Sequence, residues 1–164
     1  MKPLDILKLQ AGDYPTLVLD IASATNFEKA NELEKAGERY RVIAKRLLQL
    51  KLNTFAIDYY LKASEHFINS EHYLKAVGTE LTIYQIHRID NNHYDMASTY
   101  EKIASFYKYF FKNNETAGSY YFMSAKHHEE NQNYSSAFKK ARFACECFEE
   151  TNNVEQRRNS NSLA

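Results

Sequence analysis

The densest run of possible metal ligands in the chain is His127-His128-Glu129-Glu130. Imidazole and carboxylate groups are common zinc ligands, but adjacent residues on a helix point about 100° apart. The two imidazoles therefore cannot both face one ion, and no histidine stands four residues from His128. We interpret this run as a solvated helix end and expect no metal and no cofactor.

Cys145 and Cys147 are the two cysteines of the chain. Two residues apart on one helix, their side chains point to different faces, so they cannot form a disulfide with each other. Their spacing is not that of a zinc site, and no second pair follows. We expect buried thiols in a reducing, cytoplasmic setting.

Catalytic loops are not visible in the sequence. The glycines Gly12, Gly37, Gly78 and Gly118 stand alone, so no glycine-rich loop is available to hold a phosphate. No serine is flanked by glycines as in a strained nucleophile turn. We therefore expect a protein that is not an enzyme, with no catalytic residues.

A pattern of small residues occurs three times in the chain at a nearly fixed spacing. The interval between its first and second copies is one residue longer than the interval between its second and third copies. Glycine and alanine let two helices approach closely, and a mid-helix glycine costs roughly 1 kcal/mol relative to alanine, which implies a packing reason for it. The pattern predicts an all-α fold, a right-handed α-solenoid of about three antiparallel helix pairs. The three copies are Ala36-Gly37, Tyr40, Ala56 and Ala63; Val77-Gly78, Leu81, Ala97 and Ala104; and Ala117-Gly118, Tyr121, Ala137 and Ala144.

Asparagines about every twenty residues mark the expected turns, because asparagine tolerates left-handed backbone and also caps helices. Thr25-Asn26-Phe27-Glu28 predicts a capping box at the start of the first full helix. Apolar residues three and four apart fill the segments between turns. The expected helices span residues 27–51, 54–68, 71–90, 93–111, 115–130 and 134–150.

These elements imply a division of the chain into three parts. We expect short helices or a degenerate half-unit over residues 1–24, the repeat domain over 25–151 and a flexible tail over 152–164. Lys+Arg and Asp+Glu both number 21, and zero net charge argues against a nucleic-acid partner. No apolar run approaches the roughly 20 residues that span a bilayer, and the first residues lack the apolar core of a signal peptide.

The last expected helix carries apolar residues on more than one face, at Phe138, Phe143, Ala144, Cys147 and Phe148. Repeat arrays normally end in a polar capping helix. We therefore expect either a fragment of a longer protein or a homo-oligomer formed through the C-terminal helix.

The spacing Ala36-Gly37-x-x-Tyr40 followed by Ala56, Tyr60 and Ala63 resembles the tetratricopeptide repeat. The standard repeat has about 34 residues, whereas this period of 40–41 residues is similar to the long repeats of the soluble NSF attachment protein (SNAP) family or of bacterial regulators. The resemblance covers residues 27–150. It implies a scaffold or adaptor that binds a segment of another protein in a concave groove lined by the first helix of each unit.

Carried over by position, the resemblance places nine partner-binding residues on this concave face. Glu34 and Glu38 stand where a clamp for a C-terminal carboxylate would need Lys and Asn, so we expect a basic ligand segment instead. The solvated face of a helix is the alternative interpretation of the same residues. The residues are Glu34, Glu38, Arg41, Lys75, Thr79, Thr82, Ser119, Phe122 and Met123.

An alternative function is a membrane-trafficking attachment module, including a bacterial regulator or a protein directed at a host cell. By analogy with the attachment-protein family, Phe110 and Phe111 would contact the membrane. Adjacent helical residues cannot both point inward, so we expect at least one of these rings to be exposed or covered by the neighbouring turn.

Overall fold

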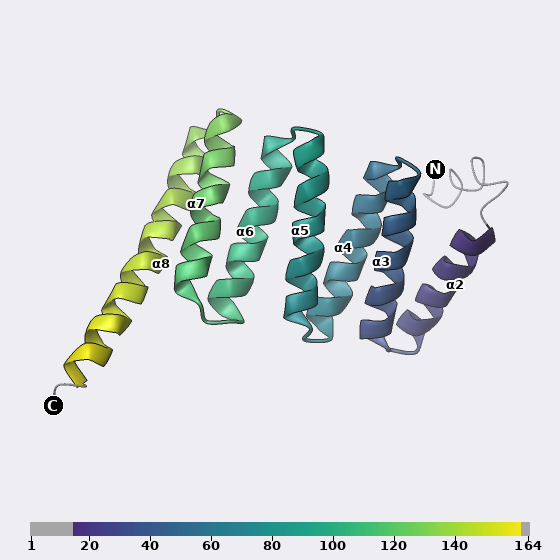
Figure 1. The fold of residues 1–164 in the computed structure, drawn as a ribbon, viewed down its shortest axis with the longest axis horizontal. Coiled ribbons are helices and arrows are strands. Elements are labelled where there is room, and N and C mark those ends of the chain that lie inside the picture. Colours follow the sequence, from purple (N-terminus) through teal and green to yellow (C-terminus); the bar gives the residue numbers. More distant parts are fainter. Residues whose placement is uncertain (1–14, 162–164) are drawn as a thin grey trace. The chain divides into compact units, whose positions relative to one another are not determined.

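A computed structural model describes residues 15–161, with side chains described from residue 15 to residue 152. These residues form α-helices joined by short turns, and none of them lies in a strand (Figure 1). The predicted all-α fold is confirmed, because consecutive helices pack against each other in a solenoid-like arrangement. The helices are α2 (Pro15–Lys29), α3 (Leu33–Gln49), α4 (Asn53–Asn69), α5 (Tyr73–Ile89), α6 (His93–Tyr109), α7 (Asn114–Glu130) and α8 (Tyr134–Asn161).

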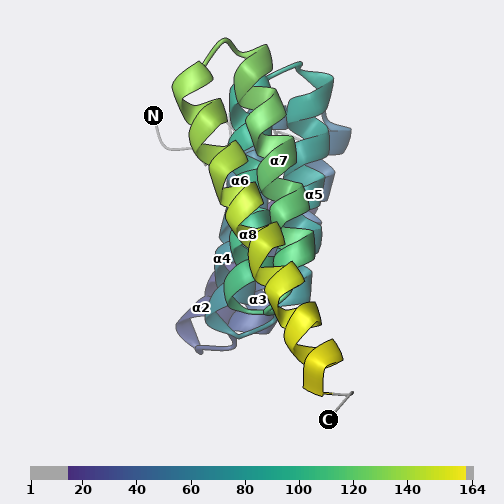
Figure 2. The same ribbon diagram turned by 90° about the vertical axis from the view of Figure 1, so that its left-hand side faces the viewer.

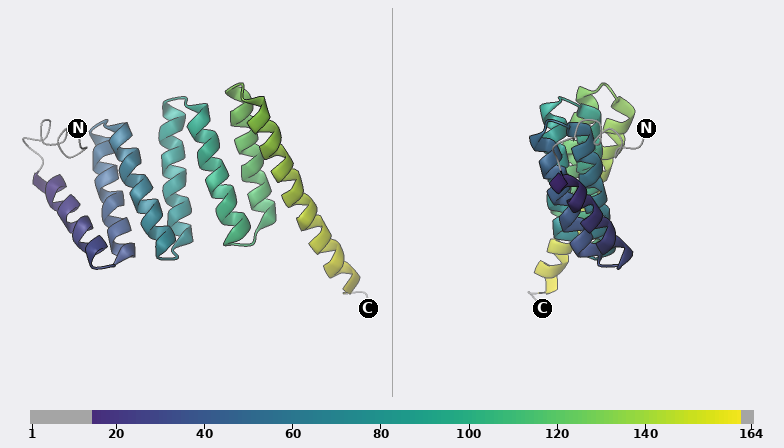
Figure 3. Two further views of the ribbon diagram at one scale, coloured as in Figure 1. Left: turned by 180° about the vertical axis from the view of Figure 1, so that it is seen from behind. Right: turned by 90° about the vertical axis from the view of Figure 1, so that its right-hand side faces the viewer.

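The chain divides into two compact units, of which the first ends at Ile83 and the second begins at Tyr84, inside α5. In the first unit α3 packs between α2 and α4 (Figure 3). Small residues of α3 lie at the contact, and larger apolar side chains fill the space around them. The buried residues of α3 are Ala36, Gly37, Tyr40, Ile43, Ala44 and Leu47.

In the second unit α7 packs between α6 and α8, and Figure 2 shows α8 facing the viewer. Part of its core consists of Ala104 from α6, Ala117 and Tyr121 from α7, and Ala144 and Cys147 from α8. Tyr107, Tyr120 and Phe143 pack against this cluster. The ammonium of the buried Lys140 in α8 forms an ion pair with Glu101 in α6.

Each turn between described helices contains one residue with left-handed backbone. This feature therefore recurs once per helix, whereas the pattern of small residues recurs once per helix pair. Four of the left-handed residues are not asparagine, so the predicted left-handed role of asparagine holds only in part. Instead, the side chains of Asn92, Asn113 and Asn133 accept hydrogen bonds from backbone N–H groups three residues later. The left-handed residues are Asn31, Lys51, Glu71, Asn91, Lys112 and Gln132.

The structure corrects the register of the second copy by one residue. The turn between α6 and α7 has four residues, whereas the other turns between described helices have three. The interval from Lys51 to Asn91 is consequently one residue shorter than the interval from Asn91 to Gln132. The sequence pattern instead places the longer interval first.

The glycines show the consequence of this correction. A Cβ added at Gly37 would lie 2.9 Å from Cε1 of Phe67, and one added at Gly118 would lie 2.8 Å from Cε1 of Phe148. The two contacts are equivalent, as predicted. Gly78 is exposed, and a Cβ added there would meet no heavy atom within 4 Å. The prediction that all three glycines share one environment is therefore wrong for Gly78.

Two helix boundaries also differ from the sequence predictions. No capping box forms at Thr25, because α2 runs through this residue and the Thr25 hydroxyl donates to the Ile21 carbonyl at 2.9 Å. The Glu28 carboxylate does not cap a helix but accepts a hydrogen bond from the Tyr40 hydroxyl on α3 at 2.8 Å. At the other end, α8 continues to Asn161 through most of the expected flexible tail. The predictions for residues 1–14 and 162–164 lie outside the described residues.

Candidate partner-binding surfaces

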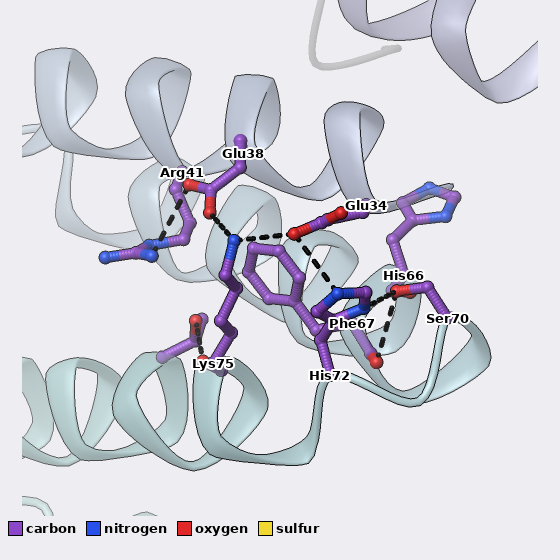
Figure 4. A network of polar contacts seen from close by, with 9 residues as sticks. Glu34, Glu38, Arg41, His66, Phe67, Ser70, His72 and Lys75 are labelled. Atoms are coloured by element: carbon purple, nitrogen blue, oxygen red, sulfur yellow. Dashed lines mark hydrogen bonds and ion pairs between the residues drawn. The ribbon is translucent and has the colours of Figure 1, made fainter. Parts of the chain in front are cut away.

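In the first unit, four of the predicted partner-binding residues meet in one polar network (Figure 4). Lys75, in the first turn of α5, donates to Glu34 Oε1 at 2.8 Å and to Glu38 Oε1 at 2.6 Å, both on α3. The hydrogen bond from Lys75 lowers the pKa of the Glu34 carboxyl below its ordinary value. The hydrogen bonds to the two carboxylates in turn raise the pKa of Lys75.

Further groups complete this network. His72 Nε2 lies 3.2 Å from Glu34 Oε1, and Arg41 Nη1 lies 3.5 Å from Glu38 Oε2. The buried ring of Phe67 lies beneath, with its centroid 5.6 Å from the Lys75 ammonium. The carboxylates expected to attract a basic ligand are thus already paired with cationic groups. A basic ligand would have to displace Lys75 to reach them.

A shallow open depression of about 420 Å³ adjoins the network where α3 begins and α4 ends. Its lining is mostly polar, so it offers hydrogen-bonding groups rather than an apolar pocket. The lining residues are Asn31, Glu32, Leu33, Glu34, Lys35, Asn69 and Ser70.

The two predicted threonines use their hydroxyls within α5. Thr79 donates to the Lys75 carbonyl at 2.8 Å, and Thr82 donates to the Gly78 carbonyl at 3.0 Å. Thr79 is only 1% exposed, so it is a core residue and cannot line a surface. Thr82 is half-buried, and its side chain remains partly accessible.

On α7, two of the three predicted residues are exposed apolar side chains. Phe122 is 48% exposed and Met123 is 38% exposed, and the Lys126 ammonium lies 4.7 Å from the centroid of the Phe122 ring. The exposed Ser119 donates its hydroxyl to the Glu115 carbonyl at 3.1 Å. The surface of α7 therefore offers two large apolar side chains beside a cation.

The equivalent positions of α3 carry Arg41 and Val42, since Gly37 and Gly118 occupy matching places. Val42 is 38% exposed, as is Met123. The first helix of the first repeat and that of the third repeat thus each expose an apolar side chain at one register position. The structure does not bring the α3 and α7 residues together within either unit.

Phe110 and Phe111 follow the end of α6. Phe110 is 46% exposed and packs its ring 5.8 Å from that of Phe106, measured between centroids. Phe111 is partly buried, with its ring centroid 5.2 Å from that of Tyr107. One ring is thus largely exposed, as expected. None of the described helices is both long enough and apolar enough to cross a membrane.

The interpretation of His127 and His128 as a solvated helix end is wrong. His128 is 5% exposed, and His127 packs among the side chains of α5 and α6. His127 Nδ1 lies 3.2 Å from His93 Nδ1, and its Nε2 lies 3.3 Å from the Tyr84 hydroxyl. The sequence contained a signal for this, since the alignment of Gly37 with Gly118 also matches His128 with the fully buried Leu47.

Ionisation of His127 reflects this environment. Burial lowers the pKa of His127 below 6.5, and the neighbouring His93 lowers it further. Within the described part of the chain, no group of three or more His, Cys, Asp or Glu side chains is placed to hold a metal ion. Cys145 is an exposed free thiol and Cys147 a buried one, so burial was predicted correctly for one of them.

Comparison of the chain with protein-family models and with curated proteins finds no match.

Proposed function

We propose that the protein is a non-catalytic interaction scaffold that holds a segment of another protein against the exposed faces of its first helices. The observation that carries this proposal is the pair Phe122 and Met123 on α7, which stand 48% and 38% exposed. Exposed apolar surface that is contiguous and rimmed by polar residues is typical of sites that bind proteins. The matching exposure of Val42 on α3 supports the same role for that helix.

The chemistry of these surfaces favours a ligand with apolar anchor residues. On α3 the charges are balanced, because Lys75 pairs with Glu34 and Glu38. A basic segment would therefore gain little from the two carboxylates. An amphipathic helix could lay its apolar side on Phe122 and Met123, which is a common mode of peptide recognition.

Kinship with long tetratricopeptide-like repeats is part of this proposal. Helix pairs recur at the interval marked by the left-handed residues Lys51, Asn91 and Gln132, and two of the first helices pack a glycine against an aromatic ring. Both features support the resemblance. We also propose a cytoplasmic location, which accords with the two free thiols.

The proposal is tested by selection from a random peptide display library on the purified full chain. We expect the wild type to enrich peptides with apolar anchors, and Phe122→Ser with Met123→Ser to weaken their binding about tenfold or more. The control is Leu61→Ser, because Leu61 is 42% exposed but lies on α4, the second helix of its pair. Failure of the wild type to enrich peptides beyond an unrelated helical protein would count against the proposal.

A second candidate function is attachment to membranes, favoured by two exposed rings at the end of α6. Tyr109 is 58% exposed and Phe110 is 46% exposed. Aromatic side chains at such positions insert readily at a bilayer interface.

Flotation of the protein with liposomes should then depend on these two rings. The double substitution Tyr109→Ser with Phe110→Ser should abolish it, whereas Phe122→Ser should not. A wild type that stays at the bottom of the gradient removes this candidate.

A further inference from the structure

An uncovered stripe of side chains runs along α8. Tyr134, Phe138, Ala141, Cys145 and Phe148 follow one another at spacings of four, three, four and three residues, which places them on one helix face. Tyr134 is 66% exposed, Phe138 is 73% exposed and Phe148 is 37% exposed. We call these five residues the α8 stripe. The adjoining side of α8 packs on α7 through buried Ala144 and Cys147, and the inner edge of the Phe148 ring packs on Gly118 of α7.

The equivalent face of α4 is covered by the next helix. Phe148 matches Phe67, because each ring packs on the glycine of its own first helix, and Cys145 then matches Ser64. Ser64 is fully buried and donates its hydroxyl to Glu80 of α5 at 2.5 Å. Phe67 is also fully buried, and Lys75 of α5 lies over its ring. Cys145 and Phe148 of the α8 stripe therefore occupy positions that, in the first unit, contact another helix.

The charges beside the stripe differ between its two halves. Lys139 and Arg142 accompany the first half, and Glu146 and Glu149 accompany the second. If a second α8 lay antiparallel to the first, the basic half of each helix would face the acidic half of the other. A parallel arrangement would instead place like charges together. The stripe is thus self-complementary in one orientation.

We propose that a second copy of this chain covers the α8 stripe, with the two α8 helices antiparallel about a two-fold axis. Phe138, Cys145 and Phe148 of each copy lie in the contact, and Arg142 of one copy faces Glu149 of the other. A two-fold contact of one surface with itself closes, so it yields a dimer and not a filament. The inference does not rest on the proposed binding of a partner at α3 and α7.

Sedimentation equilibrium of the full chain tests the proposal directly. We expect the wild type to dimerise at micromolar concentration and Phe138→Ser to weaken association about tenfold or more, because a large apolar side chain leaves the contact. Phe122→Ser is the matched control, since Phe122 is also exposed but lies on α7. Circular dichroism should show an unchanged helical content in both variants.

Exchange of charges tests the orientation. Arg142→Glu alone and Glu149→Arg alone should each weaken the dimer, and the two together should restore most of the association. Arg142 also contacts Glu146 on its own helix at 3.3 Å, so the comparison uses dissociation constants and not melting temperatures. Additivity of the two single effects would overturn the antiparallel pairing.

Chemical cross-linking locates the contact. A short bismaleimide should join two chains through the exposed Cys145, which lies near the middle of the stripe, whereas Cys147 is buried. Cys145→Ser should abolish the cross-linked product.

A strict monomer at high protein concentration would overturn the proposal. A dimer that is indifferent to Phe138→Ser, or a stripe occupied only by a different protein, would overturn it equally.

Discussion

At the residue scale, the contact between a glycine and an aromatic ring limits how closely two helices approach. Gly37 and Gly118 make the same contact, but the rings differ in freedom. Phe67 is fully buried, whereas Phe148 is 37% exposed and is therefore less enclosed by the side chains of its own chain. Gly78 has open space where a Cβ would stand. Alanine at these three positions should therefore have three different effects.

Alanine favours the helix over glycine by about 1 kcal/mol, and an overpacked core costs about 1–3 kcal/mol. We expect Gly78→Ala to raise the free energy of unfolding by about 0.5–1 kcal/mol. Gly37→Ala should lower it by about 1 kcal/mol, because the enclosed Phe67 ring cannot move aside. Gly118→Ala should be nearly neutral. Urea denaturation measures all three, and equal effects at Gly37 and Gly78 would contradict this interpretation.

His127 provides a prediction on pH at the same scale. Because burial and the neighbouring His93 lower its pKa below 6.5, the folded protein favours the neutral imidazole. The stability that this group contributes is present above pH 6.5 and is lost as the pH falls through the lowered pKa. The groups that act on it are Tyr84 from α5, His93 and Tyr100 from α6, and His128 and Glu130 from α7.

The substitution His127→Phe keeps an aromatic ring against Tyr100 but removes the titrating group. We expect its free energy of unfolding to fall less between about pH 7 and pH 5.5 than that of the wild type. Urea titrations at a series of pH values measure the difference. His128→Phe should act in the same direction, since burial also lowers the pKa of His128. Parallel pH profiles for wild type and His127→Phe would refute the argument.

At the element scale, the turns contain residues that do not favour their backbone. Glu71 has φ of 61° and Asn91 has φ of 51°, both in the left-handed region. This conformation costs an ordinary residue about 1–2 kcal/mol, while glycine adopts it freely and asparagine tolerates it. The turn between α4 and α5 therefore holds strain that the turn between α5 and α6 largely avoids.

Glu71→Gly should raise the free energy of unfolding by about 0.5–1 kcal/mol, part of the relief being offset by the greater freedom of glycine in the unfolded chain. Asn91→Gly is the matched control and should change stability by only a few tenths of a kcal/mol. Thermal unfolding followed by circular dichroism compares the two. A larger gain at Asn91 than at Glu71 would show that the strain lies elsewhere.

The helices from α4 onward could be predicted, because apolar periodicity and asparagine spacing both mark them, whereas the helix expected over residues 27–51 is interrupted by the turn between α2 and α3. The register of the second copy could not be predicted, since three glycines suggested one alignment while the extra residue lies in the turn between α6 and α7. The network around Lys75 was also beyond the sequence. Glu34 and Lys75 stand far apart in the chain, and only the packing of α3 beside α5 brings their side chains together.

The predicted surface residues differ in exposure for a similar reason. Phe122 and Met123 are exposed, whereas Thr79 is buried in the core. A position carried over from the resemblance identifies a helix face only if the register is correct. Thr79 came from the second copy, where the register is shifted by one residue, and adjacent helical residues differ by about 100° in direction.

At the scale of the whole molecule, α2, α3 and α4 pack on their neighbours in sequence within the first unit, and α6, α7 and α8 do so within the second. Stability in such an array is approximately the sum of local interfaces, so damage to one interface opens that region first. Leu47 is fully buried in the first unit, and Tyr121 is 5% exposed in the second. Truncation of either side chain leaves a cavity that costs about 2–5 kcal/mol.

We expect Leu47→Ala to accelerate amide hydrogen exchange in α3 and α4 while α7 and α8 keep their protection, because the lost contacts belong to the first unit. Tyr121→Ala should produce the reciprocal pattern, with α6, α7 and α8 accelerated. Exchange measured by mass spectrometry on peptides from each helix distinguishes the two. Uniform acceleration over all helices in both variants would instead mean that the chain opens as one cooperative block, and additive local interfaces would no longer describe its stability.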